Sequence, residues 1–147
     1  MLEVTETVMM ADPDTAAARL NQLKDLGVRI AMDDFGTGYS SLSYLSRLPV
    51  DILKMDRSFL GAGNTDSGLA AAIIAIGERL DLEVVAEGIE EPEQIGTLRG
   101  LGCELGQGFF FARPMTQPAL VDYLDEEEEG RDEDELEASD GRASSAA

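Results

Sequence analysis

The sequence predicts an α/β fold built on a parallel sheet. Short apolar segments with the character of strands alternate with segments whose leucines and isoleucines recur at helical spacing. Such alternation is typical of parallel strands joined by right-handed helical crossovers. Polar residues also recur at the points where the apolar segments end. With 147 residues, the chain is long enough for one domain with a substantial core.

Five segments have the composition of short strands. The first alternates, whereas the second is an apolar run that leads into two adjacent aspartates. The predicted strands are residues 2–6, 28–32, 51–56, 83–88 and 105–111.

The intervening segments have helical periodicity and helix-terminating residues. Asp12-Pro13 supplies a cap and a first-turn proline for the first helix, and Gly27 ends it. A short helix with leucines at helical spacing ends at Pro49. Further predicted helices are residues 69–80, 92–101 and 118–124.

The C-terminal segment differs from the rest in composition. Residues 125–147 contain 11 acids and 2 arginines, so they contribute −9 to the net charge of −19. They are rich in Ser and Ala and lack periodicity, which predicts a disordered acidic tail after a domain of residues 1–124. No basic groove is indicated, which argues against binding to long nucleic acid.

The residue types available restrict the chemistry. There is no histidine, which excludes histidine triads, ligands and general bases. The single cysteine, Cys103, is interpreted as a small buried packing residue. Carboxylates, lysine, amides and hydroxyls remain, and these favour Mg²⁺ or Mn²⁺ over softer metals. No apolar run is long enough to span a bilayer and no signal peptide is evident, so we expect a cytoplasmic protein without a membrane contact.

Polar side chains fall at the carboxyl-terminal ends of successive predicted strands. In α/β folds this edge of the sheet is where ligands bind. Asp34 alone is equally consistent with a solvated turn that caps the next helix. Capping does not explain why acids recur at the same end of four strands, so we favour a metal site. The polar strand-end residues are Glu3, Asp33, Asp34, Lys54, Asp56, Glu87 and Gln107.

Two divalent ions held by such carboxylates could activate a water and stabilise the leaving oxygen in phosphodiester hydrolysis. Glu3 and Asp33 are expected to bind one ion and Asp34 a second. Glu87 is a further ligand or the base that orients the water. Lys54 would place a positive charge near a phosphate oxygen or the attacking hydroxide. The alternative for Lys54 is a salt bridge to Asp33 or to Asp56.

Other polar residues are expected to support this site. Gln107 could orient a carboxylate or a water by hydrogen bonding. Glu6 would hold the loop that follows Asp34, and Glu90 would brace the turn after Glu87. In that loop, the turn of Gly36, Thr37 and Gly38 is not followed by the Gly-Lys-Ser/Thr of a phosphate loop.

Five ordered segments together resemble the EAL-domain family of cyclic di-GMP phosphodiesterases. Their order and spacing both fit, apart from a slightly short loop near residues 61–67. The segments are Leu-Glu-Val-Thr-Glu (2–6), Ala-Met-Asp-Asp-Phe-Gly-Thr-Gly-Tyr-Ser-Ser-Leu (31–42), Leu-Lys-Met-Asp-Arg-Ser-Phe (53–59), Val-Ala-Glu-Gly-Ile-Glu (85–90) and Gly-Gln-Gly-Phe-Phe-Phe (106–111), followed by Arg-Pro.

The resemblance implies a TIM-like (β/α)8 barrel that uses Mg²⁺ or Mn²⁺ to hydrolyse cyclic di-GMP to pGpG. It implies that Glu3, Asp33, Asp34 and Glu87 are metal-site acids and that Glu87 is similar to the proposed general base. Lys54 resembles the lysine near the attacking water, with Gln107 nearby. The loop of residues 34–40 resembles the one that links metal, substrate and dimer partner.

The chain also departs from the family pattern. The Glu-Ala-Leu motif, a metal-binding asparagine and a substrate-binding arginine are absent. We therefore expect a partial barrel of about five strands with open edges. It should be marginally stable alone, or pair with another copy or with a complementing N-terminal half. It is then either a phosphodiesterase that is active only with the missing half, or a silent remnant that serves as an interaction or weak cyclic di-GMP-binding module.

Overall fold

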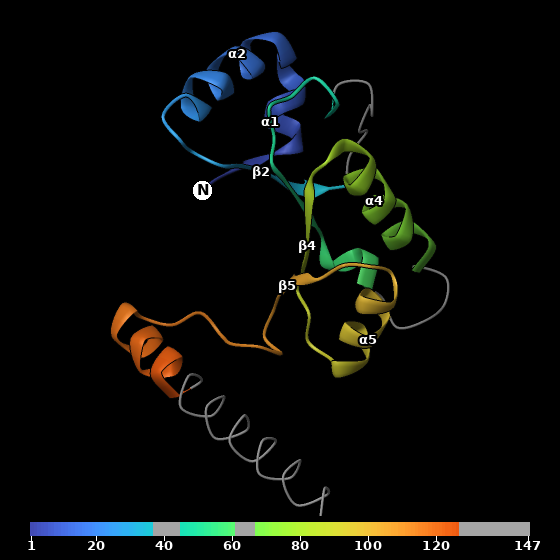
Figure 1. The fold of residues 1–147 in the computed structure, drawn as a ribbon, viewed down its shortest axis with the longest axis vertical. Coiled ribbons are helices and arrows are strands. Elements are labelled where there is room, and N and C mark those ends of the chain that lie inside the picture. Colours follow the sequence, from blue (N-terminus) through green and yellow to red (C-terminus); the bar gives the residue numbers. More distant parts are fainter. Residues whose placement is uncertain (37–44, 61–66, 127–147) are drawn as a thin grey trace, which may run out of the picture. The chain divides into compact units, whose positions relative to one another are not determined.

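A computed structural model describes residues 1–36, 45–60 and 67–126 of the chain (Figure 1). The chain divides into two compact units, Met1–Ala112 and Arg113–Ala147. The first contains the sheet. In the second, residues 117–126 are helical, so this helix runs two residues past the expected end at residue 124. Residues 127–147, expected to form a disordered tail, lie outside the described residues.

The first unit is built on one parallel sheet whose strands follow the order of the sequence, β1-β2-β3-β4-β5. Every neighbouring pair is parallel, which confirms the predicted α/β class. The sheet is open within the described part of the chain, with β1 and β5 at its two edges. The strands are β1 (Leu2–Thr5), β2 (Ile30–Phe35), β3 (Ile52–Met55), β4 (Glu83–Glu87) and β5 (Leu105–Gln107).

Helices connect the strands, as the periodicity predicts. In Figure 1, α4 and α5 lie on the right of β4 and β5. Helices α1 and α2 lie at the opposite edge of the sheet, above β2. None of the described helices is both long and apolar enough to cross a membrane. The helices of this unit are α1 (Glu6–Ala11), α2 (Pro13–Lys24), the 3-10 helix η1 (Arg57–Leu60), α4 (Ser67–Leu80) and α5 (Pro92–Gly100).

Helix α2 begins as its sequence predicts, but it ends at Lys24 and a turn of residues 25–27 follows, so Leu26 lies outside the helix. Asp12 Oδ1 accepts a hydrogen bond from Thr15 N–H at 3.2 Å, and Pro13 occupies the first turn. Gly27 follows with a φ of +79°, a conformation that suits glycine. Helix α1 was not predicted: Thr5, its N-cap, is a common N-cap residue type, but the alternation of residues 2–6 assigned Thr5 and Glu6 to the first strand.

The core is centred on β3, all four of whose residues are buried. Side chains from the helices pack around it, including Leu20 of α2, Ile73 and Ile74 of α4 and Leu98 of α5. The central strand is buried most because it has neighbours on both edges and helices over its outer face. Cys103 is also buried, which confirms its predicted packing role, and burial raises the pKa of its thiol.

All five strands differ from their predicted bounds: β1 and β4 by one residue at one end, β3 by one residue at each end, and β2 and β5 by more. β2 continues through the aspartate pair to Phe35, so both acids lie within the strand. β5 ends at Gln107 instead of Phe111 because the chain turns at Gly108, which packs against the backbone of Ile89. Phe110 N–H then donates to Ile89 O at 3.0 Å. The predicted short helix of Leu42, Leu45 and Leu48 begins outside the described residues; of its described part, Leu45 is helical and residues 46–47 form a turn before Pro49.

Candidate functional site

The ammonium group of Lys54 lies at the centre of three carboxylates. Lys54 Nζ is 2.7 Å from Glu87 Oε1, 2.9 Å from Glu3 Oε1 and 3.2 Å from Asp33 Oδ1. The lysine itself is only 5% exposed. These four residues come from four adjacent strands, so the structure brings together most of the predicted site. It pairs Lys54 with Asp33, as in the salt-bridge alternative, and adds both glutamates.

Strand register accounts for this convergence. Glu3 lies opposite Ala31, two residues before Asp33, and Lys54 lies opposite Val85, two residues before Glu87. Residues two apart on a strand point to the same face, so these side chains share one face of the sheet. Between the pairs Met32–Leu53 and Phe35–Met55, β2 has two residues where β3 has one. This bulge places both aspartates opposite the single residue Lys54.

Asp34 adopts an unusual backbone conformation at this bulge. Its φ is +55°, which is uncommon outside glycine, although aspartate tolerates it better than most residues. Asp34 is exposed, whereas Asp33 is half-buried. Strained backbone at a strand end that carries clustered charges is typical of functional sites. The bulge therefore presents two neighbouring carboxylates in different environments.

The electrostatics of the cluster are strongly coupled. Burial alone lowers the pKa of Lys54, but hydrogen bonds to Glu87, Glu3 and Asp33 outweigh it and raise the pKa well above its usual value. The three carboxylates therefore favour the charged form of Lys54. Burial also raises the pKa of Glu87, and the nearby carboxylates of Asp33 and Glu3 add to this against the opposing effect of Lys54.

One ammonium against three carboxylates leaves a formal excess of two negative charges. Hard carboxylate oxygens with such an excess fit a divalent ion such as Mg²⁺ or Mn²⁺ in charge and donor type. The oxygens nevertheless point at Lys54. Among the described residues, no three acidic or thiol side chains are grouped as metal ligands. The donor set therefore fits a metal, while the spacing shown is that of an ion-pair cluster.

Further predicted residues lie around the cluster at the same edge of the sheet. Asp56 does not pair with Lys54: its Oδ1 accepts from Ser58 N–H at 2.9 Å, and hydrogen bonds from the side chain and the N–H of Ser58 lower the pKa of Asp56. Gln107 is exposed and opposite Glu87 in register. Glu90 Oε1 lies 3.9 Å from Arg57 Nη1, with both side chains exposed. A groove beside Glu87 is lined by Asp56, Arg57, Glu90, Gln107 and Phe109.

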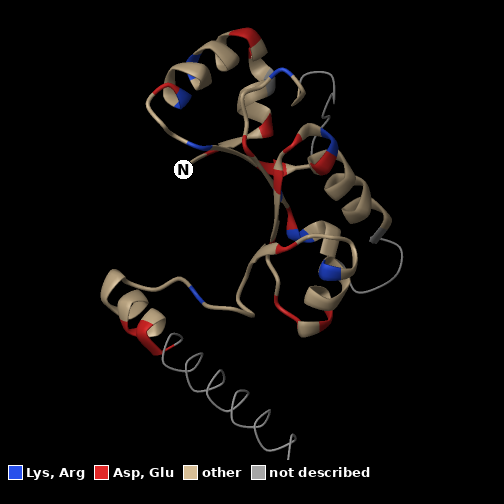
Figure 2. Cartoon of the chain, in the orientation of Figure 1, with Lys and Arg blue, Asp and Glu red and all other residues tan. Residues whose placement is uncertain are grey.

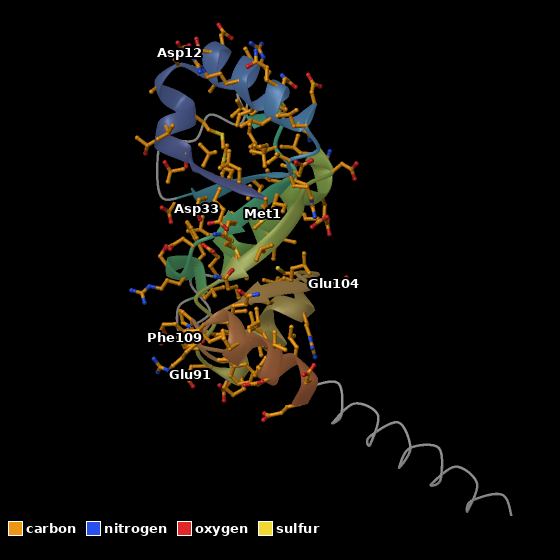
Figure 3. All side chains as sticks on the ribbon, turned by 90° about the vertical axis from the view of Figure 1, so that its left-hand side faces the viewer. Met1, Asp12, Asp33, Glu91, Glu104 and Phe109 are labelled. Atoms are coloured by element: carbon orange, nitrogen blue, oxygen red, sulfur yellow. The ribbon has the colours of Figure 1, made fainter. Side chains whose placement is uncertain are left out.

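In Figure 3 the carboxyl-terminal ends of the strands are on the left: Asp33 and Phe109 lie on that side of the sheet, and Glu104, which precedes β5, lies on the right. That separation is expected for residues at opposite ends of parallel strands. Figure 2 shows acidic residues on the strands as well as on the helices, with far fewer basic ones. The groove is therefore in an acidic setting in which Lys54 and Arg57 supply positive charge.

Glu6 is buried, which is unusual for a glutamate. It is 6% exposed at the start of α1, and its Oε2 accepts no hydrogen bond from the described residues. Its predicted contact with the loop after Asp34 stays a prediction, since Thr37 and Gly38 lie outside the described residues. Gly36 has a φ of +93°, and a Cβ there would lie 2.8 Å from the ring of Phe59.

Sequence reasoning missed two residues that shape the groove. Gln94 Oε1 accepts from the N–H groups of Glu90 and Glu91 at 2.8 and 2.9 Å, and its Nε2 donates to Leu60 O at 3.1 Å. It therefore holds the loop after β4 against η1. Arg57 lines the groove directly. Arg57 follows Asp56 directly at a predicted strand end, and this position could have identified it as a site residue from the sequence.

A family model described as EAL domain matches residues 1–114 of the chain. The chain belongs to the EAL domain family. Among curated proteins, it is 51% identical over 126 residues to the cyclic di-GMP phosphodiesterase NbdA of Pseudomonas aeruginosa, covering 84% of this chain and 16% of NbdA. It is 48% identical over 124 residues to the bifunctional diguanylate cyclase/cyclic di-GMP phosphodiesterase MucR of the same organism, covering 82% of this chain and 18% of MucR.

Solved EAL structures have the same fold. The PaMucR phosphodiesterase in its c-di-GMP complex aligns with a TM-score of 0.77 and 48% identity, covering 81% of this chain and 49% of that chain. The EAL domain of Mycobacterium smegmatis DcpA aligns with a TM-score of 0.79 and 41% identity, covering 85% and 57%. Klebsiella pneumoniae BlrP1, solved with manganese and cyclic di-GMP, aligns with a TM-score of 0.70 and 38% identity, covering 76% and 29%. The fold of this EAL chain is thus TIM-barrel-like, and the chain spans about half of the first two solved chains.

Proposed function

We propose that this EAL chain carries one part of the active site of a metal-dependent phosphodiesterase that hydrolyses cyclic di-GMP to pGpG. The observation that carries the proposal is the convergence of Glu3, Asp33 and Glu87 on Lys54 at the carboxyl-terminal edge of the sheet. The phosphodiesterase names of NbdA and MucR support it. Since the chain spans less than a fifth of either relative, the activity of the whole protein is part of this proposal.

Glu3, Asp33, Asp34 and Glu87 would hold Mg²⁺ or Mn²⁺, and the manganese in the BlrP1 structure supports this choice of ion. When bound, such an ion would acidify a water and offset charge on the phosphate. Glu87 would accept the proton of the water, whose oxygen forms a bond to phosphorus as the bond from phosphorus to a ribose oxygen breaks. The departing ribose oxygen takes up a proton from solvent, and the product is the linear dinucleotide.

Lys54 would contribute a fixed positive charge. Three surrounding carboxylates keep it protonated, so it would stabilise negative charge on a phosphate oxygen without itself moving a proton. Arg57 lies on the groove wall and would attract the second phosphate of the cyclic dinucleotide. Gln107 would orient Glu87 or a water by hydrogen bonding, and Glu6 and Glu90 would support the neighbouring loops.

The second candidate is a silent EAL remnant that binds cyclic di-GMP weakly or serves as an interaction module. The observation that favours it is the ion-pair spacing of the cluster, in which Lys54 occupies the point on which the carboxylates converge. An ammonium that permanently satisfies these oxygens would compete with a metal. Such a protein would bind ligand in the groove but would not turn it over.

Metal binding and turnover distinguish these candidates. The full chain, alone and together with the preceding part of the MucR EAL domain, is titrated with Mn²⁺ by calorimetry and assayed for pGpG formation from cyclic di-GMP. The enzyme proposal predicts saturable Mn²⁺ binding and pGpG formation in the presence of that part. Absence of both would refute it, and ligand binding without turnover would favour the silent remnant.

Asp33→Ala provides the matched test of the site. It should reduce pGpG formation at least a hundredfold and weaken Mn²⁺ binding, while circular dichroism stays unchanged. The control is Asp14→Ala, which removes an exposed acid from the first turn of α2. Equal turnover by the two variants would show that the acid cluster is not the active site.

A further inference from the structure

Gln94 is hydrogen-bonded to two of the segments that line the groove at the carboxyl-terminal edge of the sheet. Its Oε1 accepts from the N–H groups of Glu90 and Glu91, in the loop after β4, at 2.8 and 2.9 Å. Its Nε2 donates to the carbonyl of Leu60, the last residue of η1, at 3.1 Å. Gln94 and Leu60 are 34 residues apart in the sequence. One side-chain amide therefore joins the loop after β4 to η1.

Helix capping explains only part of this arrangement. Gln94 is the third residue of α5 after the N-cap residue Glu91, and a Gln or Glu at that position commonly accepts a hydrogen bond from the N-cap N–H. That cap requires only an acceptor oxygen, which glutamate also provides. The bond to Leu60 O requires an amide donor, and it is shielded from water because Leu60 is buried and Gln94 is half-buried. The contact with η1 therefore explains why this position carries an amide.

The position of η1 depends on the segments packed around it, because a 3-10 helix of four residues makes few hydrogen bonds of its own. The ring of Phe59 lies so close to Gly36 that a Cβ there would be 2.8 Å from it. Arg57 packs against Gly88, where a Cβ would be 2.5 Å from Cβ of Arg57. Gln94 adds a directional bond at the carboxyl end of η1 and so fixes how η1 lies against the loop after β4.

We propose that Gln94 is a positioning residue that sets the width of the groove and thereby its affinity for the ligand. The inference rests on the proposed function, in which Arg57 attracts a phosphate of the cyclic dinucleotide. Arg57 Nη1 and Glu90 Oε1 are 3.9 Å apart with both side chains exposed, and such a pair is too weak to fix the spacing of their main chains. Gln94 bonds to the main chain of both segments, so it controls that spacing instead.

The acid cluster is held independently of Gln94. Glu87 Oε1 is 2.7 Å from Lys54 Nζ, and β4 pairs with β3 along its length. None of these contacts involves α5. Loss of the Gln94 bonds should therefore weaken ligand binding while the arrangement of the acid cluster is kept. A change confined to binding raises KM and leaves kcat unchanged.

Two substitutions separate the contact with η1 from helix capping. Gln94→Glu keeps the acceptor oxygen for the amides of Glu90 and Glu91, but it replaces the donor to Leu60 O with a carboxylate oxygen that repels this carbonyl. Gln94→Met has a similar length and removes both the acceptor and the donor. Thr97→Glu is the control for charge, since it adds the same negative charge about one turn further along α5, at an exposed position.

Ligand binding and hydrogen exchange are measured on the full chain. Cyclic di-GMP is titrated by calorimetry without metal, so that no turnover occurs, and amide exchange is followed by NMR. We expect Kd to rise at least fivefold for both Gln94 variants and to stay within twofold for Thr97→Glu. Exchange at Glu90 and Glu91 should be at least tenfold faster in Gln94→Met and unchanged in Gln94→Glu. In the pGpG assay with Mn²⁺, both Gln94 variants should raise KM and keep kcat within twofold.

Unchanged binding by Gln94→Glu would overturn the inference, since it would show that Gln94 only caps α5. An equal loss of binding in Thr97→Glu would overturn it too, because charge alone would then account for the effect. So would a fall in kcat at unchanged KM, which would place the action of Gln94 on the acid cluster. All three results leave the proposed function intact.

The remaining outcomes bear on the proposed function. Binding that Gln94→Glu weakens, without pGpG formation by any of the chains, would support the inference and overturn the phosphodiesterase. No cyclic di-GMP binding and no pGpG formation by the unmodified chain would overturn the proposed function and, with it, the inference.

Discussion

Asp33 and Lys54 face each other across a bulge between β2 and β3, with Asp33 Oδ1 3.2 Å from Lys54 Nζ. The same ammonium group is closer still to Glu87 and Glu3. One cation thus joins four strands at the edge of the sheet. Because the cation is buried and its acids are partly buried, the cluster affects stability as well as chemistry.

Replacement of Lys54 tests how much the cluster contributes to the stability of the fold. Lys54→Met should lower the free energy of unfolding by about 3–5 kcal/mol at pH 7, since it leaves three carboxylates facing one another without a cation. Mn²⁺ should restore part of this loss if the carboxylates bind it. Urea unfolding with and without Mn²⁺ measures both effects. Arg29→Met is the control: its pair with Glu83 is about half exposed and should contribute less than about 1 kcal/mol.

The left-handed conformation of Asp34 predicts different results for two substitutions. Asn tolerates this conformation, so Asp34→Asn should change the free energy of unfolding by less than about 0.5 kcal/mol. A β-branched side chain does not, so Asp34→Val should lose about 1–2 kcal/mol more. Thermal unfolding of both variants gives the comparison. Equal stability would show that residue 34 does not hold a positive φ in solution.

The lowered pKa of Asp51 leads us to expect a specific pH dependence of stability. Burial acts to raise the pKa of its carboxyl, but hydrogen bonds from Lys24 and from the N–H of Ile30 outweigh burial and lower it. The unfolded chain therefore binds more protons between the two pKa values, so stability is present above about pH 4 and is lost as the pH falls further. Asp51→Asn should flatten the fall in the urea midpoint between pH 5 and pH 2.5. Asp14→Asn, at an exposed position of α2, should leave that fall unchanged.

The turn after β4 predicts opposite effects for two glycine substitutions. Gly88 has a φ of +68°, and a Cβ there would lie 2.5 Å from Cβ of Arg57, so Gly88→Ala should cost about 1–3 kcal/mol. Gly96 lies inside α5 with open space around it, so Gly96→Ala should add about 0.5–1 kcal/mol. Urea unfolding measures both. A neutral Gly88→Ala would contradict the close packing of η1 on this turn.

The sequence predicts the strands and most helices because local periodicity and caps specify them. The cap at Asp12, the proline at the start of α5 and the buried strand β3 all follow from neighbouring residues. Helix α1 was missed because it has only six residues and its first residue, Glu6, continues the alternation of the preceding strand. β5 was drawn too long because its end depends on Gly108 packing against Ile89, a contact between segments distant in the sequence.

The sequence by itself determined which residue types are available and that acids recur at one end of the strands. Residue order is local information, and it sufficed for the α/β class and for the list of strand-end residues. Only the tertiary structure decided that Lys54 sits among three carboxylates, that Asp56 turns instead to Ser58, and that the bulge sets both aspartates opposite one lysine. Those facts depend on strand register and burial, which arise when distant segments pack and exclude water.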